Sequence, residues 1–269
     1  MNDFFVIFAC GRTIFFAAMY RYFIYTSYNG TRYNGWQRQP NGLSIQQSVE
    51  EALSTLLRQT VNIVGAGRTD AGVHAQWMAA HFDLNLPLGD RDHFIRKLNC
   101  ILPYDIVVER IAQVKGDAHA RFDALSRTYR YAITEHKNPF NYEQVYRMSL
   151  HGIDFSLMNE ACKILFDYTD FTSFSKLHTD TRTNNCHIDY ARWEQEGRMW
   201  IFSIKADRFL RNMVRAIVGT LLEVGRGKRS LSDFQKVIEG KDRCLAGASV
   251  PAKGLMLAEI GYPEELFID

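Results

Sequence analysis

The sequence predicts an α+β fold built largely on antiparallel sheet. Segments with alternating apolar residues, typical of strands, are interleaved with segments whose apolar residues recur at helical spacing. Some predicted strands, such as 188–194 and 199–206, are joined by a turn of hairpin length, and such pairs run antiparallel. The chain of 269 residues, with 46% apolar and 23% charged residues, has the composition of an ordinary globular protein.

The first half of the chain alternates strands and helices. Asn29-Gly30 is a turn-forming dipeptide that ends the first predicted strand. Ser44 and Gln47 have the spacing of a capping box, which marks the start of a helix. The strands and helices predicted here cover, in order, residues 20–28, 45–58, 61–64, 78–84, 92–100 and 106–114.

The second half repeats this rhythm. Asp154 and Ser230 are residue types that cap the N-termini of helices, and Gly225 is expected to close a long helix. Glu196-Gly197 supplies the turn of a hairpin. The elements predicted here cover, in order, residues 128–134, 154–166, 188–194, 199–206, 210–224, 230–239 and 255–260.

The similar element orders of the two halves predict two related α/β domains, 19–116 and 117–269. No linker rich in Gly, Ser or Pro separates them. We therefore expect the two domains to pack into one body around a basic cleft.

Residues 1–18 do not fit this plan. The apolar runs 4–10 and 14–18 are split by Gly11-Arg12, and no basic segment precedes the first run. They match a secretory signal poorly, and neither approaches the length of a membrane span. Met19 stands directly before a good strand, so we expect Met19 to be the natural start and 1–18 to be a non-native extension. N-terminal sequencing of the native protein tests this; a product beginning at Met1 would contradict it.

Composition narrows the chemistry further. The five cysteines are scattered without a Cys-x-x-Cys pair, and the eight histidines include no His-x-x-x-His pair. We therefore expect no disulfide framework, no metal site and a reducing, cytoplasmic setting. The net charge is only +2, so any affinity for nucleic acid has to come from clustered basic residues.

The most informative stretch is a loop over 67–75 that reads GRTDAGVHA. Gly67 and Gly72 permit positive φ and let a partner approach the backbone. Asp70 is expected to project from this loop beside Arg68. Taken alone, such a stretch is usually a turn with a surface ion pair.

All nine residues of this loop match the catalytic loop of one family, and the chain resembles the tRNA pseudouridine synthases of the TruA type. Two further segments carry the resemblance, Arg-x-Tyr-Arg-Tyr at 127–131 and a stretch at 209–219 that contains Arg215. It extends over about residues 19–262. It implies two α/β domains with a shared central sheet, a homodimer, and isomerisation of uridine in the tRNA anticodon stem-loop at positions 38, 39 and 40.

The resemblance makes Asp70 the catalytic residue. The reaction breaks the N1–C1′ bond, turns the uracil and rejoins it at C5, so it needs no redox step, and no cofactor is expected. A carboxylate nucleophile can add covalently to the nucleoside or stabilise a glycal intermediate, and the sequence leaves both routes open. The resemblance also implies that Arg68 holds the flipped-out nucleotide and its phosphate. The plainer alternative is that Arg68 pairs with Asp70 as a loop staple.

Tyr129, Tyr131 and Ile133 share one face of a predicted strand. We expect Tyr131 and Ile133 to be core residues. For Tyr129 the resemblance implies that the ring stacks on the target uracil, and a phenol can also assist proton removal from C5.

The remaining site predictions are arginines. Arg208, Arg211 and Arg215 are spaced to share one face at the start of the predicted helix 210–224, where the helix dipole disfavours cations, which indicates an anionic partner. The resemblance implies that Arg215 pairs with Asp70 and holds it ionised and oriented. Arg121 lies in a segment that resembles an RNA-facing part of the family. Further candidates for phosphate contacts are Arg32, Arg38, Arg127 and Arg130.

A noncatalytic RNA-binding module is the alternative from another class. α+β domains with aromatic residues on a sheet bind RNA by stacking, and such a module would make Asp70 dispensable. A dinucleotide-binding loop at Gly65-x-Gly67 is disfavoured because Asp70 fills the slot of the third glycine. The combination of Asp70, Arg68 and Tyr129 favours an enzyme over this module. The resemblance implies that its partner is tRNA, and no membrane partner is expected.

Overall fold

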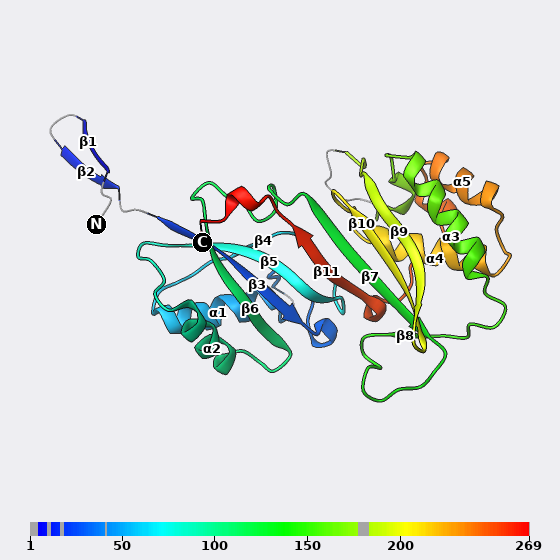
Figure 1. Ribbon diagram of the computed structural model, residues 1–269, viewed down its shortest axis with the longest axis horizontal. Helices are drawn as coiled ribbons and strands as arrows, with labels where there is room; N and C mark the ends of the chain where they lie inside the picture. Colours follow the sequence, from blue (N-terminus) through cyan, green and yellow to red (C-terminus); the bar gives the residue numbers. More distant parts are fainter. Residues whose placement is uncertain (1–4, 10–11, 17–18, 41, 177–182, 269) are drawn as a thin grey trace.

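A computed structural model describes residues 5–9, 12–16, 19–40, 42–176 and 183–268. One long twisted sheet crosses the molecule (Figure 1). Its strands, from one edge to the other, are β6 (Ile106–Val114), β3 (Tyr20–Tyr28), β5 (His74–Leu84), β11 (Leu255–Gly261), β7 (Ser126–Thr134), β10 (Met199–Ala206) and β9 (Ile188–Glu196). Two short strands extend it, β4 (Val64–Gly65) on β5 and β8 (Tyr146–Arg147) on β7.

Most neighbouring strands in this sheet are antiparallel, as hairpin connections require. β11 is the strand that joins the halves. It pairs parallel with β5 through Met256 and His74, and antiparallel with β7 through Leu255 and Tyr131. The predicted α+β class with largely antiparallel sheet is therefore confirmed.

The helices divide between the two ends of the sheet (Figure 1). α1 (Ile45–Leu57) and α2 (Arg91–Ile101) lie beside the β3–β6 end. α3 (Phe155–Ile164), α4 (Met213–Gly225) and α5 (Leu231–Glu239) lie beside the β9–β10 end. Each group of helices closes its own cluster of buried apolar side chains. The division into domains 19–116 and 117–269 stays a prediction, because the clusters cross that boundary: Val73 belongs to the second cluster, and Leu257 and Ile260 belong to the first.

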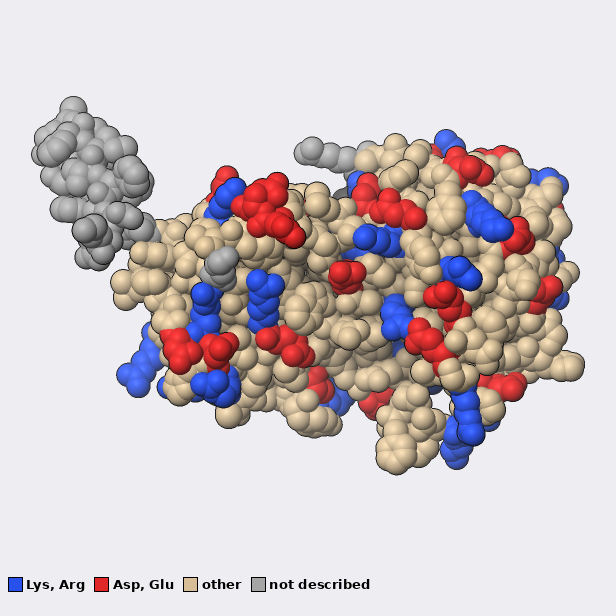
Figure 2. All heavy atoms as spheres, in the orientation of Figure 1, with Lys and Arg blue, Asp and Glu red and all other residues tan. Residues whose placement is uncertain are grey.

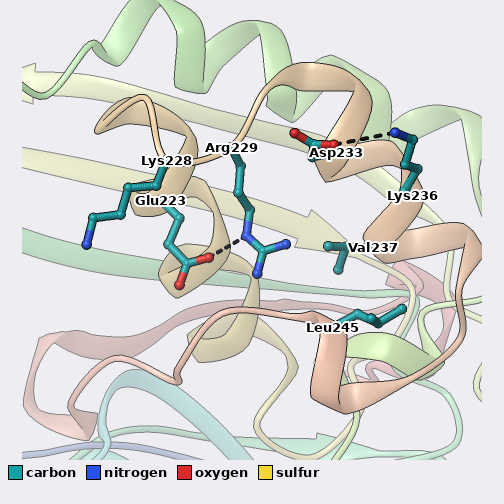
Figure 3. A pocket seen from close by; sticks show the side chains of 7 residues that line it. All are labelled: Glu223, Lys228, Arg229, Asp233, Lys236, Val237 and Leu245. Carbon is teal, nitrogen blue, oxygen red and sulfur yellow. Dashed lines mark hydrogen bonds and ion pairs between the residues drawn. The ribbon is translucent and has the colours of Figure 1, made fainter.

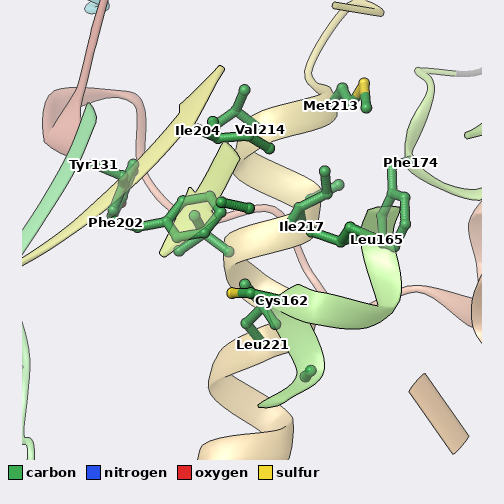
Figure 4. Close-up of a cluster of buried hydrophobic side chains, with 14 of the residues drawn as sticks. Tyr131, Cys162, Leu165, Phe174, Phe202, Ile204, Met213, Val214, Ile217 and Leu221 are labelled. Carbon is green, nitrogen blue, oxygen red and sulfur yellow. The ribbon is translucent and has the colours of Figure 1, made fainter. Parts of the chain in front are cut away.

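α4 is the central helix of the second cluster. Val214 lies beside Ile204 of the sheet, whereas Ile217 lies beside Leu165, and Cys162 approaches from α3 (Figure 4). All of these side chains are buried. Removing apolar surface of this extent from water is the main force that fixes α4 against the sheet.

The first two strands form a sheet of their own. β1 (Phe5–Ala9) and β2 (Arg12–Phe16) pair antiparallel with each other. The expectation of a non-native extension at 1–18 falls in part on residues 1–4, 10–11 and 17–18, which lie outside the described residues. It stays a prediction.

The start of α4 differs from the prediction. The helix begins at Met213 and not at Leu210, because Asn212 has a left-handed backbone, with φ +67° and ψ 2°. The side-chain amide of Asn212 donates to the Ser249 hydroxyl at 2.6 Å, and Ser249 lies in a loop distant in the sequence. The end differs as well: Gly225 is the last helical residue, and Gly227 supplies the positive φ after it.

The strand predicted over 61–64 is also shorter than expected, since only β4 (Val64–Gly65) is paired there. The Val61 amide donates to the Ser54 hydroxyl at 3.0 Å, and the Ile63 amide donates to the Glu50 carboxylate at 3.1 Å. Side chains of α1 therefore take the backbone donors that a sheet ladder would use.

Candidate active site

Asp70 lies in a tight turn between β4 and β5. The Val73 amide donates to the Asp70 carbonyl at 3.1 Å, and Gly72 has φ +75°. The prediction of a positive φ is thus confirmed for Gly72. It is wrong for Gly67, which is absent from the positive-φ residues and has open space around the position of a Cβ.

A second loop, which contains Gly35 and Trp36, contacts this turn at Thr69, as does Tyr28 at the end of β3. The Tyr28 and Thr69 hydroxyls are 2.9 Å apart, and the Trp36 amide donates to the Thr69 carbonyl at 3.2 Å. A Cβ on Gly35, where φ is +87°, would lie 2.3 Å from the same carbonyl. Gly35 and Tyr28 were not among the predicted site residues. The Asn34-Gly35 pair in a loop was the available signal, but nothing in the sequence links it to Asp70.

The Asp70 carboxylate faces two guanidinium groups from the other half of the chain. Arg211 Nε lies 3.4 Å from Oδ1, and Arg215 Nη1 lies 3.8 Å from Oδ2. Arg215 is anchored further, because its Nε donates to the Val250 carbonyl at 2.7 Å. The structure thus brings Arg215 to Asp70 as the resemblance implied, and it adds Arg211.

Arg68 does not act as a staple for Asp70. Its side chain is exposed, and within the described part of the chain it makes no ion pair with that carboxylate. The alternative of a local Arg68–Asp70 ion pair is therefore wrong.

Tyr129 lies on β7 where the two apolar clusters meet, and it packs against both. The Phe209 ring meets it edge-on, with centroids 5.1 Å apart. Burial raises the pKa of the Tyr129 phenol to about 12; Arg127 opposes this shift, and the charge of Asp70 adds to it. Tyr131 and Ile133 are fully buried, which confirms them as core.

The predicted arginine stripe on α4 is wrong in its geometry. Arg208 and Arg211 precede the helix, and only Arg215 belongs to it. The left-handed Asn212 turns the chain between them, so the three side chains do not share a helical face. Arg211 still reaches Asp70. Burial raises the pKa of the Cys186 thiol to about 12, and the charge of Arg208 opposes this shift.

Arg121 is exposed on a structured loop. Its guanidinium carbon lies 5.9 Å from the centre of the Phe122 ring. His119 Nδ1 accepts the amide of Arg121 at 3.1 Å, and His119 packs against the buried His81 with ring centroids 4.7 Å apart. The loop therefore presents Arg121 and Phe122 to solvent from a fixed base.

On the face that Figure 2 presents, basic and acidic side chains are interspersed, without a broad patch of one sign.

A pocket of about 440 Å³ lies beyond the C-terminal end of α4, where Arg229 pairs with Glu223 (Figure 3). None of the predicted site residues lines it. The predicted basic cleft stays a prediction.

The described residues contain no group of three or more His, Cys, Asp or Glu side chains placed to hold a metal ion. Nor do they contain a helix with the length and apolar character needed to cross a membrane.

Comparison with known proteins decides the family. The family model described as tRNA pseudouridine synthase matches residues 24–123 and 161–263. The chain belongs to the tRNA pseudouridine synthase family. Asp70 and Arg121 lie in the first matched segment and Arg215 in the second, whereas Tyr129 lies between them.

Curated relatives cover nearly the whole chain. tRNA pseudouridine synthase A of Parabacteroides distasonis is 63% identical over 249 residues, 93% of this chain and 98% of the relative. The protein of the same name from Bacteroides thetaiotaomicron is 58% identical over 253 residues, 93% of each chain. That from a Geobacter species is 40% identical over 242 residues, 88% of this chain and 96% of the relative.

Membership in this family makes the protein an isomerase that acts on uridine in tRNA. It favours the enzyme over the noncatalytic RNA-binding module.

Proposed function

We propose that this pseudouridine synthase modifies the anticodon stem-loop of tRNA, at positions 38, 39 and 40, with Asp70 as its nucleophile. One observation carries the proposal. The Asp70 carboxylate stands on a braced turn and is met by Arg211 and Arg215 from a segment more than a hundred residues away. A carboxylate held so firmly in a half-exposed position is suited to attack a bound group.

The roles of Asp70 and its partners follow from this arrangement. Arg215 is the less exposed of the two guanidinium groups and is fixed to the Val250 carbonyl, so it orients the carboxylate. Asp70 then adds covalently to the nucleoside, or it stabilises a glycal intermediate while the uracil turns. In both routes the base leaves through N1 and returns through C5, and the proton at C5 is lost to solvent.

Arg68 and Tyr129 are proposed to hold the target nucleotide. Arg68 is exposed beside Asp70, so its guanidinium is available to a flipped-out nucleotide and its phosphate. The Tyr129 ring offers a surface for the uracil next to Phe209. Because its pKa is about 12, the Tyr129 phenol is neutral at physiological pH and acts as a donor or proton relay rather than as a phenolate.

Arg121, Arg208 and Arg211 are proposed as substrate-binding residues that contact phosphates. Three adjacent target positions imply that tRNA shape matters more than base sequence. We further propose that the enzyme works in the cytoplasm without a cofactor, as a homodimer whose two subunits touch one tRNA. The resemblance to the family supports these three statements.

The test uses tRNA transcripts that contain C5-tritiated uridine. The purified enzyme should release tritium, and release should fall when cytidine replaces uridine at positions 38, 39 and 40. Release that persists from such a transcript would contradict the proposed target site. Tight tRNA binding without any release would overturn the catalytic proposal and support the binding module.

A further inference from the structure

The Arg127 side chain forms hydrogen bonds to several segments around Asp70. Its guanidinium donates to four backbone carbonyls, those of Ala124 at 2.8 Å, Asp207 at 2.6 Å, Arg121 at 2.7 Å and Ala66 at 3.4 Å. Both terminal nitrogens are therefore engaged within the protein. The sequence makes Arg127 a candidate for a phosphate contact, and these internal contacts argue against that role.

These segments are those that carry the proposed site. Ala66 lies two residues before Arg68, at the entrance of the Asp70 turn. Asp207 begins the segment that carries Phe209, against which Tyr129 packs, and Arg211, which pairs with Asp70. Arg121 stands on the exposed loop with Phe122. Tyr129 itself follows two residues after Arg127 on the same strand.

The chemistry of the guanidinium explains why an arginine stands here. Carbonyl oxygens only accept hydrogen bonds, so a side chain that bonds to four of them needs several donors and no acceptor. Arginine supplies five donors in a planar, rigid fork, whereas the lysine ammonium has three donors on a flexible stem. The Arg127 side chain is half-buried, and burial lowers its pKa.

We propose that Arg127 is a positioning residue for the isomerisation. Its hydrogen bonds hold the backbone at Ala66, Arg121 and Asp207. They thereby position Asp70, Tyr129 and Arg211 around one nucleotide. This inference rests on the proposed function, since it assumes that Asp70 and Tyr129 act on the bound uridine.

The test compares two variants, Arg127→Lys and Arg127→Ala, with the control Arg147→Ala. Arg147 is an exposed arginine whose Nε donates to a single carbonyl, that of Glu135, outside the proposed site. Both Arg127 variants should lose about 10- to 100-fold in kcat for tritium release, because small displacements of reacting groups have effects of this size. KM should rise by a smaller factor, since Arg127 also holds the segments of Arg121 and Arg211. Methylguanidinium in the buffer should restore part of the activity of Arg127→Ala and leave the wild type and the control unchanged.

Other results would overturn the proposal. Unchanged kcat in both Arg127 variants would show that these hydrogen bonds are dispensable. A rise in KM at constant kcat, with a shallower salt dependence of tRNA binding, would show that Arg127 contacts a phosphate instead. If Arg127→Ala does not fold, Arg127→Lys decides: thermal unfolding like that of the wild type together with reduced kcat supports positioning, and full activity refutes it. Failure of the wild type to release tritium would instead contradict the proposed function.

Discussion

At the scale of residues, the two partners of Asp70 are not equivalent. The Arg211 side chain is 57% exposed, and that of Arg215 is 20% exposed and bonded to the Val250 carbonyl. Exposed ion pairs contribute little because water and side-chain entropy oppose them. We therefore expect Arg215 to determine where the carboxylate points and Arg211 to remain accessible to tRNA.

This difference predicts the order of two substitutions. Arg215→Gln should lower kcat for tritium release by about 10- to 100-fold, because the carboxylate loses its fixed partner. Arg211→Gln should act mainly on KM and reduce the salt dependence of tRNA binding. Steady-state kinetics at two salt concentrations measure both effects. Equal losses of kcat in the two variants would contradict the distinction.

Tyr129 allows its two proposed roles to be separated. Tyr129→Phe keeps the ring against Phe209 but removes the hydroxyl, so KM should be unchanged while kcat falls by about 100-fold or more. Tyr129→Ala removes the ring as well and should weaken tRNA binding. Binding and tritium-release assays with the same tRNA compare the variants. Full activity of Tyr129→Phe would restrict the residue to stacking.

At the scale of elements, local patterns predicted most helices and strands correctly. Ser44, Asp154 and Ser230 cap α1, α3 and α5 as expected, each with its side chain accepting a backbone amide. In the capping box predicted at Ser44, the Gln47 amide group donates to Glu51 instead of returning to the cap. The start of α4 could not be predicted, because Ser249 holds Asn212 in its left-handed conformation from a distant loop.

α4 packs closely against the loop that contains Ala248, so replacing a glycine of this helix should change stability in the direction opposite to the usual one. Replacing a glycine in mid-helix by alanine ordinarily stabilises a helix by about 1 kcal/mol. At Gly219, however, the added Cβ would lie 1.9 Å from the Ala248 carbonyl oxygen. Gly219→Ala should therefore lower the free energy of unfolding by about 1–3 kcal/mol, as overpacking does.

Urea denaturation of Gly219→Ala measures this change. Gly89→Ala is the matched control, since nothing lies within 4 Å of a Cβ at that position and its φ is not in the left-handed region. A stabilised Gly219→Ala protein would show that α4 and the Ala248 loop are not in close contact.

At the scale of the whole molecule, the site depends on pairings that no local pattern contains. β11 comes from the C-terminal end of the chain and lies between β5 and β7, which places Asp70 and Tyr129 on neighbouring segments. The resemblance to the family is what points to Asp70, Tyr129 and Arg215 as site residues. The internal use of Arg127 and the support from Gly35 became visible only once distant loops were brought together.

Three histidines make the free energy of unfolding depend on pH. His74, His81 and His119 each accept a backbone amide at Nδ1, so each ring is neutral at that nitrogen. Burial lowers the pKa of all three, that of His81 to about 4. Between about pH 6.5 and 4 the unfolded chain therefore binds more protons than the folded protein, and the free energy of unfolding falls as the pH falls.

Urea denaturation across that pH range tests this prediction. His81→Asn retains an acceptor for the Ala120 amide but does not titrate, so it should remove about one proton from the pH dependence of unfolding. A pH dependence identical to that of the wild type would contradict the assignment of His81.

The most direct test of the central claim is tritium release from C5-tritiated tRNA by Asp70→Asn and Asp83→Asn under single-turnover conditions. Asp83 is a matched control, because its side chain is also 29% exposed and pairs with an arginine, Arg21, outside the proposed site. Asp70→Asn should release no tritium, and Asp83→Asn should release it at nearly the rate of the wild type. Release by Asp70→Asn at the rate of the control would contradict the assignment of Asp70 as the nucleophile.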